Sequence, residues 1–206
     1  GQTDFNVQKR YQGLSQTPLN ENGLRQAKKI AEILKNEDFD AAFSSPLKRA
    51  VQTAKEIVKP HKNLKLILRE ELRELDYGHL SGKTPNEIEI ENPGTWAKRE
   101  KNKYDFDHLG GETFRDADEK RVKPLLKEFQ EKYSSRTILA VSHGGLGRLI
   151  IGNLLGLEPK EKMIIDIPND CIYYINYRPH KTEVNYFLVD SKKEGNGYLI
   201  REDWIV

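Results

Sequence analysis

The amino-acid sequence predicts an α/β fold: a three-layer α/β/α sandwich with a largely parallel central sheet. Apolar runs of strand length alternate with amphipathic helical segments along the chain, which is the pattern of this class. The run TILAVS at 137–142 is apolar almost throughout, as a strand that is buried on both faces requires. With 206 residues the chain is long enough to bury a substantial core, and we expect a single domain over 1–206.

The first predicted helix covers 21–36, where apolar residues recur at helical spacing and Asn20 is a suitable N-cap. A short strand, FDAAF at 39–43, follows and leads into a second helix. Ser45 is suited to cap this second helix. Pro46 fits its first position, because proline lacks the N–H that would have no partner there.

The middle of the chain continues this alternation. Another strand is expected at 64–68 (LKLIL), and TPNE at 84–87 resembles the capping box that begins a helix. A longer helix is predicted over 114–133, and Pro124 should kink it or mark its true start.

After the buried strand, the chain passes through His143 into a helix that Gly156 can end. The C-terminal part then alternates in the manner of strands. These late strands are predicted at 172–177, 183–190 and 198–204, with a tight turn at 194–197 between the last two.

Polar side chains lie at the carboxyl ends of two predicted strands, where ligands bind in parallel α/β sheets. Ser44 and Ser45 follow one of these strands, and His143 follows the other. The opening segment GQTDFNVQKRYQG is polar and turn-forming, like a loop that follows a first strand, and we expect a strand to precede Gly1. These three segments should meet at one edge of the sheet and form a polar site.

Several residues at this edge suit an anionic substrate, although each has a structural alternative. His143 is followed by Gly144, and glycine lets the backbone approach a ligand closely at a helix N-terminus. Arg49 lies in the first turn of a helix, where a cation opposes the helix dipole unless an anion is bound. Arg10 fits the same interpretation from a loop. Glu74 is able to donate a proton to a leaving oxygen if its surroundings keep it protonated. The alternatives are a structural histidine, solvated arginines and a surface carboxylate.

The composition excludes several classes of function. The formal charge of +2 comes from 34 basic and 32 acidic residues that are well interspersed, so no basic patch for nucleic acid is expected. No apolar segment approaches the roughly 20 residues that span a bilayer. The single cysteine, Cys171, fits a reducing cytosol. No nucleotide-binding or metal-ligand motif is found, so we expect a cytoplasmic protein without cofactor or metal.

Five segments together resemble the histidine phosphatase superfamily, also called the phosphoglycerate mutase-like family. In family order they are GQTDFNVQKRYQG with TPLNENGLRQA, SSPLKRAVQTA, ELRELDYGHLSG, GGET at 110–113 and VSHGG. Each segment alone is a weak signal, whereas the ordered set is specific and covers the chain up to about Gly156.

The resemblance implies catalysis through a transiently phosphorylated histidine. In the family a strand ends in Arg-His-Gly, and Gly1 matches that glycine, so the first strand and the nucleophile would lie immediately before Gly1. Glu74 would be the general acid and afterwards the base that activates water. The other implied contacts are His143, Arg49, Asn6 and Gly144 at the phosphoryl group, Gln2, Thr3 and Arg10 around it, and Glu112 at the pocket mouth or behind it.

The predicted function is a phosphomonoesterase for a small phosphorylated metabolite, as a monomer or homodimer with no nucleic-acid or membrane partner. One alternative is a cofactor-dependent phosphoglycerate mutase. Only Gly78 to Gly110 separates the YG loop from GGET, a span more like the small phosphatases than the mutases. An alternative of another class is a phosphate-binding pseudoenzyme without the nucleophile. The residue encoded before Gly1 separates the two classes, because histidine there supports the enzyme.

Overall fold

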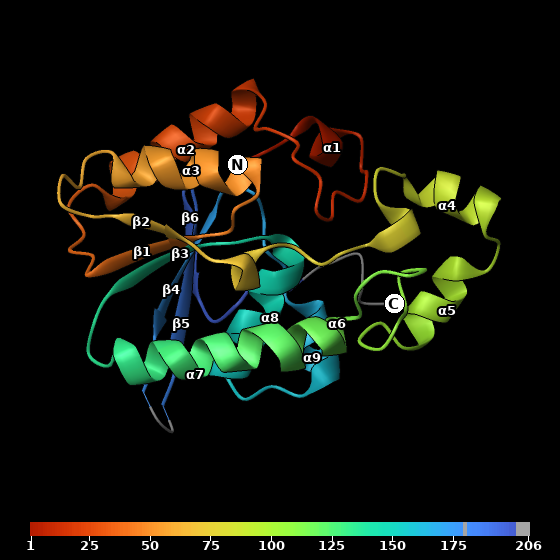
Figure 1. The fold of residues 1–206 in the computed structure, drawn as a ribbon. Helices are drawn as coiled ribbons and strands as arrows, with labels where there is room; N and C mark the ends of the chain where they lie inside the picture. The colour runs from red at the N-terminus through yellow and green to blue at the C-terminus, as the bar shows by residue number, and fades with distance from the viewer. Residues whose placement is uncertain (179–180, 201–206) are drawn as a thin grey trace.

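The computed structural model describes residues 1–178 and 181–200, whose strands form two sheets of three strands each (Figure 1). The first sheet is parallel: β1, Ala41–Ser44, lies between β2, Leu66–Leu68, and β3, Ile138–Val141. All residues of β1 are buried, as expected for a central strand covered on both faces. The predicted α/β class with a parallel sheet is confirmed.

The later strands form the second sheet, which is antiparallel. β4, Cys171–Asn176, pairs with β5, Glu183–Leu188, and β5 pairs in turn with β6, Lys193–Asn196. The predicted turn at 194–197 is therefore wrong, because most of this segment belongs to β6. Gly195 is needed for packing within the strand and not for a turn. A Cβ at Gly195 would lie 2.6 Å from the hydroxyl oxygen of Tyr186, its partner on β5.

The strand predicted at 198–204 is represented by a single pairing. Ile200 forms an isolated antiparallel bridge with Ile165, and 201–204 lie outside the described residues. The third strand of the antiparallel sheet thus lies at 193–196, earlier in the sequence than the predicted strand at 198–204.

Helices cover both faces of the parallel sheet (Figure 1). α2, Glu21–Leu34, and α3, Lys48–Val58, lie on one face, while α7, Lys123–Lys132, and α8, Gly144–Leu154, lie on the other. This arrangement gives the layers of an α/β/α sandwich.

The core is divided by the sheet because successive side chains of a strand point to opposite faces. Phe43 of β1 packs in a buried cluster with Leu125 of α7 and Leu146 of α8. Its neighbour Ala42 packs on the other side with Ile30 of α2 and other residues of α2 and α3. Burial of these apolar faces, at about 25 cal/mol per Å² of apolar surface, is the main force that fixes the helices on the sheet.

The connections carry shorter helical segments. These are α1, Asp4–Val7; η1, Glu70–Leu72; η2, Gly78–Leu80; α4, Pro85–Glu91; α5, Thr95–Lys101; α6, Phe114–Ala117; and α9, Pro159–Ile164. α6 leads directly into a π-helical turn, Asp118–Val122, and then into α7, so the helix predicted over 114–133 is contiguous but has a widened middle turn. Pro124 lies in the first turn of α7, as predicted for a helix start.

Several predicted helix boundaries are confirmed. The Asn20 side chain caps α2 by accepting from Gly23 N at 2.9 Å. Thr84 forms the expected capping box with Glu87 at the start of α4. Gly156 follows α8 with a positive φ of 68°, a conformation that glycine adopts without strain.

The predicted start of α3 is wrong. The helix begins at Lys48 with Leu47 at the N-cap, so neither Ser45 nor Pro46 has the expected position. Ser45 is fully buried, and its hydroxyl oxygen accepts from Leu47 N at 3.2 Å and lies 2.7 Å from His143 Nε2. A contact with a residue far along the chain thus takes the place of the local cap.

Across 1–178 and 181–200, every helix is too short or too polar to cross a lipid bilayer.

His108 is a fully buried histidine in the aromatic part of the core, and it gives the fold a pH-dependent stability. Its ring lies 5.0 Å from the ring of Tyr77 and 5.9 Å from that of Phe114, and Nδ1 lies 2.6 Å from Glu112 O. Burial, opposed in part by this hydrogen bond, lowers the pKa of His108 to about 4. The unfolded chain therefore binds this proton at higher pH than the folded chain does.

We expect the free energy of unfolding to be unaffected by His108 at pH 7 and to fall as the pH drops from about 6.5 towards 4. The loss at pH 5 should be about 2 kcal/mol from this group. Urea unfolding of the wild type and His108→Gln at pH 7 and pH 5 measures it. His143 contributes in the same direction, so the readout is the difference between the two proteins. An identical pH dependence in both would contradict this role.

Candidate active site

A cavity of about 1760 Å³ lies at the carboxyl ends of β1 and β3 and continues between β3 and β4. It brings together most of the residues that the sequence singled out. Those lining it are Asn6, Arg10, Arg49, Glu74, His143 and Gly144, together with Gly1.

Arg49 and His143 contact each other inside this cavity. Arg49 Nε donates to His143 Nδ1 at 3.2 Å, and the other imidazole nitrogen, Nε2, lies 2.7 Å from Ser45 Oγ. Because Nδ1 accepts from the guanidinium, the proton of the neutral imidazole lies on Nε2, which acts as a donor. Arg49 Nη1 and Nη2 donate to Ser15 O and Gly13 O at 2.8 and 2.9 Å, and these bonds fix the plane of the guanidinium.

The electrostatics of the cavity favour a bound anion. Burial lowers the pKa of His143 well below its usual range, and the positive charges of Arg49 and Arg121 lower it further. Burial also lowers the pKa of Arg49, an effect that the negative charge of Glu74 opposes. A buried guanidinium beside an imidazole N–H is suited to neutralise the oxygens of a phosphoryl group.

The side chain of Glu74 lines the cavity and faces the N-terminus of α8. It is 7% exposed, and its carboxylate accepts from Gly145 N at 3.0 Å and from Leu146 N at 3.1 Å. Leu75 N donates to the same carboxylate at 3.0 Å. These three N–H groups hold the side chain of Glu74 in one orientation.

The close approach of Glu74 to α8 requires glycine on the helix. A Cβ at Gly145 would lie 2.5 Å from Glu74 Oε1 and 2.9 Å from both Leu75 Cδ1 and the hydroxyl oxygen of Tyr77. Contacts this short do not occur between real atoms, so a side chain at this position would displace the carboxylate. The glycine of the HGG sequence thus makes room for Glu74.

The opening segment contributes to the site unevenly. Asn6 lines the cavity, and its Oδ1 accepts from Thr3 N and Thr3 Oγ1, both at 2.9 Å. Thr3 is fully buried and caps α1, while Gln2 bonds to Gln26 and to two asparagines near the start of α2. Neither Gln2 nor Thr3 is among the described residues that line the cavity. The structure therefore gives these two side chains contacts that build the loop.

Arg10 lies at the edge of the cavity and ties the opening segment to α4. Its guanidinium donates to Glu87 Oε2 at 2.6 Å, to Glu87 Oε1 at 3.0 Å and to Gly82 O at 2.7 Å. The bonds from Arg10, together with the bond from Thr84 N, lower the pKa of Glu87 to about 2.

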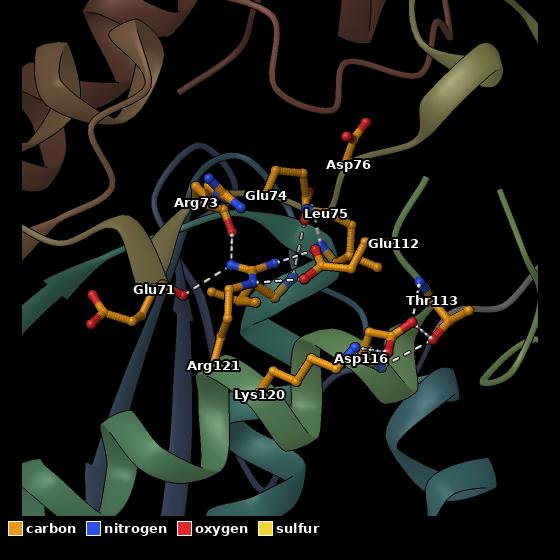
Figure 2. A network of polar contacts seen from close by, with 12 residues as sticks. Glu71, Arg73, Glu74, Leu75, Asp76, Glu112, Thr113, Asp116, Lys120 and Arg121 are labelled. Carbon is orange, nitrogen blue, oxygen red and sulfur yellow. Dashed lines mark hydrogen bonds and ion pairs between the residues drawn. The ribbon is translucent and has the colours of Figure 1, made fainter. Parts of the chain in front are cut away.

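Sequence reasoning missed Arg121, which lies behind Glu74 in a polar network (Figure 2). Arg121 donates to both carboxylate oxygens of Glu112, at 2.9 and 2.6 Å, and to the carbonyl oxygens of Glu71 and Arg73. A signal for it existed in the sequence, because Arg121 is seven residues after Phe114 and four before Leu125, and so shares a helix face with these apolar residues. A charged residue at such a position needs buried polar partners.

In the described part of the chain, no group of three or more His, Cys, Asp or Glu is arranged to hold a metal ion.

Comparison with known proteins decides the family. A family model described as histidine phosphatase superfamily (branch 1) matches residues 1–189. The chain belongs to this superfamily. It is 34% identical over 157 residues to phosphoserine phosphatase 1 of Hydrogenobacter thermophilus, a match that covers 76% of this chain and 74% of that protein. It is also 29% identical over 202 residues to a metal-independent phosphoserine phosphatase of Arabidopsis thaliana, with 98% and 83% of the two chains covered.

Solved structures agree with the family. A mycobacterial glucosyl-3-phosphoglycerate phosphatase has a TM-score of 0.76 at 26% identity, with 98% of this chain and 96% of that chain covered. A phosphoserine phosphatase of Entamoeba histolytica has a TM-score of 0.75 at 27% identity, with 89% and 90% covered. The predicted family, the fold class and the assignment as a phosphoric monoester hydrolase are confirmed.

Proposed function

We propose that this phosphatase acts without a metal on a small phosphorylated metabolite, through a phosphohistidine intermediate. The observation that carries the proposal is the grouping of Arg49, His143 and Glu74 around one cavity at the carboxyl ends of two parallel strands. The described residues thus offer cationic and N–H donors for a phosphoryl group and a carboxylate for proton transfer. The name of the metal-independent relative supports the absence of a metal from the mechanism.

The space between the two sheets supports the proposed place of the nucleophile. β3 ends the first sheet and β4 begins the second, and both strands line the cavity. Gly1 lines the same cavity as His143. We propose that the residue preceding Gly1 in the full-length protein is the nucleophilic histidine, at the end of a strand between β3 and β4.

In the proposed mechanism, the histidine attacks the phosphorus in line and the bond from phosphorus to the leaving oxygen breaks. Arg49 stabilises the charge that develops on the equatorial oxygens, and His143 does so once its Nε2–H donates to the substrate in place of Ser45. Glu74 donates a proton to the leaving oxygen. It then takes a proton from the water that attacks the phosphohistidine, which releases phosphate and restores the free histidine.

The full-length protein should hydrolyse small phosphomonoesters in the presence of excess chelator, because no step of this mechanism uses a metal. Phosphate release from a panel of such esters, with and without EDTA, measures the effect. The panel should include phosphoserine and phosphoglycerate, which the names of relatives suggest. Conversion of one phosphoglycerate isomer to another without release of phosphate would identify a mutase instead. Loss of hydrolysis in chelator, restored by Mg²⁺ or Zn²⁺, would rule out the metal-free mechanism.

A further inference from the structure

Glu74 lies on a segment that has no regular structure to hold it. η1 ends at Leu72 and η2 begins at Gly78, so Arg73 to Tyr77 belong to neither a helix nor a strand. The position of the Glu74 backbone therefore depends on the buried side chains of Leu72 and Leu75 and on individual hydrogen bonds from neighbouring elements.

Arg121 supplies the bonds on one side of Glu74 (Figure 2). Its Nη1 donates to Arg73 O at 2.9 Å and to Glu71 O at 3.1 Å. The carbonyl of Arg73 belongs to the same peptide group as the nitrogen of Glu74. Because that group is planar, the bond to Arg73 O also fixes the direction in which the chain enters Glu74.

Glu112 supports the segment around Glu74 in two ways. Its carboxylate binds Arg121 in a bidentate pair, with Nε to Oε1 at 2.9 Å and Nη2 to Oε2 at 2.6 Å. Its backbone N donates to Asp76 O at 2.7 Å, on the other side of Glu74. The side chains of Arg121 and Glu112 are only 10% and 17% exposed, so solvent screens this pair little.

Arg121 lies in a widened turn of its helix. Arg121 lies in the π-helical turn Asp118–Val122, and π-helical turns are frequent at functional sites. The turn is anchored by the fully buried Asp118, which accepts from Tyr104 Oη at 2.6 Å and from Lys162 Nζ at 2.7 Å.

We infer that Arg121, held by Glu112, is a positioning residue that sets the place of the Glu74 carboxylate for proton transfer. This role rests on the proposed function, because it assumes that Glu74 is the general acid. The bidentate geometry is essential to it: lysine would keep the positive charge but is unable to bind a carboxylate and two carbonyl groups in one plane.

Arg121→Lys in the full-length protein should lower phosphoryl transfer from an alkyl phosphate by about tenfold or more, as expected for a displaced catalytic group. The first step with p-nitrophenyl phosphate should change by no more than about twofold, since its leaving group needs little protonation. Glu112→Gln should show the same bias more weakly. The matched control is Arg115→Lys, because Arg115 makes a similar bidentate pair with Asp105, at 2.5 and 3.2 Å.

A double variant separates positioning from general damage. If Arg121 acts through Glu74, Arg121→Lys should cause no further loss with the alkyl phosphate in a Glu74→Gln background. Multiplied losses, or equal losses for both substrates, would overturn the inference. If Arg121→Lys fails to fold, as judged by circular dichroism, Glu112→Gln and its double variant give the same test.

Different results would reject the positioning role of Arg121 and the acid role of Glu74. A leaving-group bias in Glu74→Gln but none in Arg121→Lys or Glu112→Gln would overturn the positioning role alone. No bias in Glu74→Gln would overturn the proposed acid and the positioning role with it.

Discussion

Replacing Arg49 or His143 with alanine should reduce turnover of the full-length enzyme on a phosphomonoester by about a hundredfold or more. Both side chains line the same cavity and bond to each other at 3.2 Å, so each substitution removes a polar side chain from the place where charge develops. Steady-state kinetics of the purified variants, with folding checked by thermal denaturation, measure the loss.

Lys48→Ala is the matched control, because Lys48 is exposed and directly precedes Arg49 on α3. Arg49→Lys keeps the charge, and it should still lose most of the activity because lysine lacks the planar fork. Near-normal turnover in folded alanine variants would show that the contact between Arg49 and His143 only stabilises the fold.

Glu74→Gln should damage the hydrolysis of alkyl phosphates far more than the first step with p-nitrophenyl phosphate. An alkoxide is a poor leaving group that needs a proton, whereas a nitrophenolate departs with little assistance. Glutamine keeps the size of the side chain, and its one oxygen can accept from Leu75 N and Leu146 N as Oε1 does. The bond from Gly145 N to Oε2 is lost, because an amide NH2 does not accept, so folding of the variant is checked by circular dichroism.

The measurement is a burst experiment that separates phosphoryl transfer to the enzyme from the later attack of water. A hundredfold loss is the order expected when a general acid is removed from the step that needs it. An equal loss in the first step for both substrates would reject Glu74 as the acid. Glu70, Glu71 and Asp76 would then be tested in its place.

The sequence predicted the convergence of the site because parallel strands bring their carboxyl ends to one edge of a sheet. β1 and β3 are adjacent, and their register pairs Ser44 with Val141, so Ser45 and His143 come into contact. Local capping signals were also reliable where the side chain had no competing partner, as at Asn20 and Thr84.

The errors arose where a distant contact overrode a local preference. Ser45 contacts His143 instead of starting α3, and Gly195 makes room for Tyr186 in a strand instead of forming a turn. Thr3 caps α1 and is fully buried, and its predicted place near the substrate stays a prediction. Arg121 was missed because its partners, Glu112 and two backbone carbonyls, come together only in the folded chain.

The proposed mechanism requires that a histidine directly before Gly1 is transiently phosphorylated by the substrate. The most direct test is to mix the full-length enzyme with a radiolabelled phosphomonoester in chelator, denature it within the first turnover and locate the label by peptide mass spectrometry. We predict an acid-labile, alkali-stable phosphate on that histidine. Release of phosphate with no label on the protein, or a label on any other residue, would contradict the mechanism.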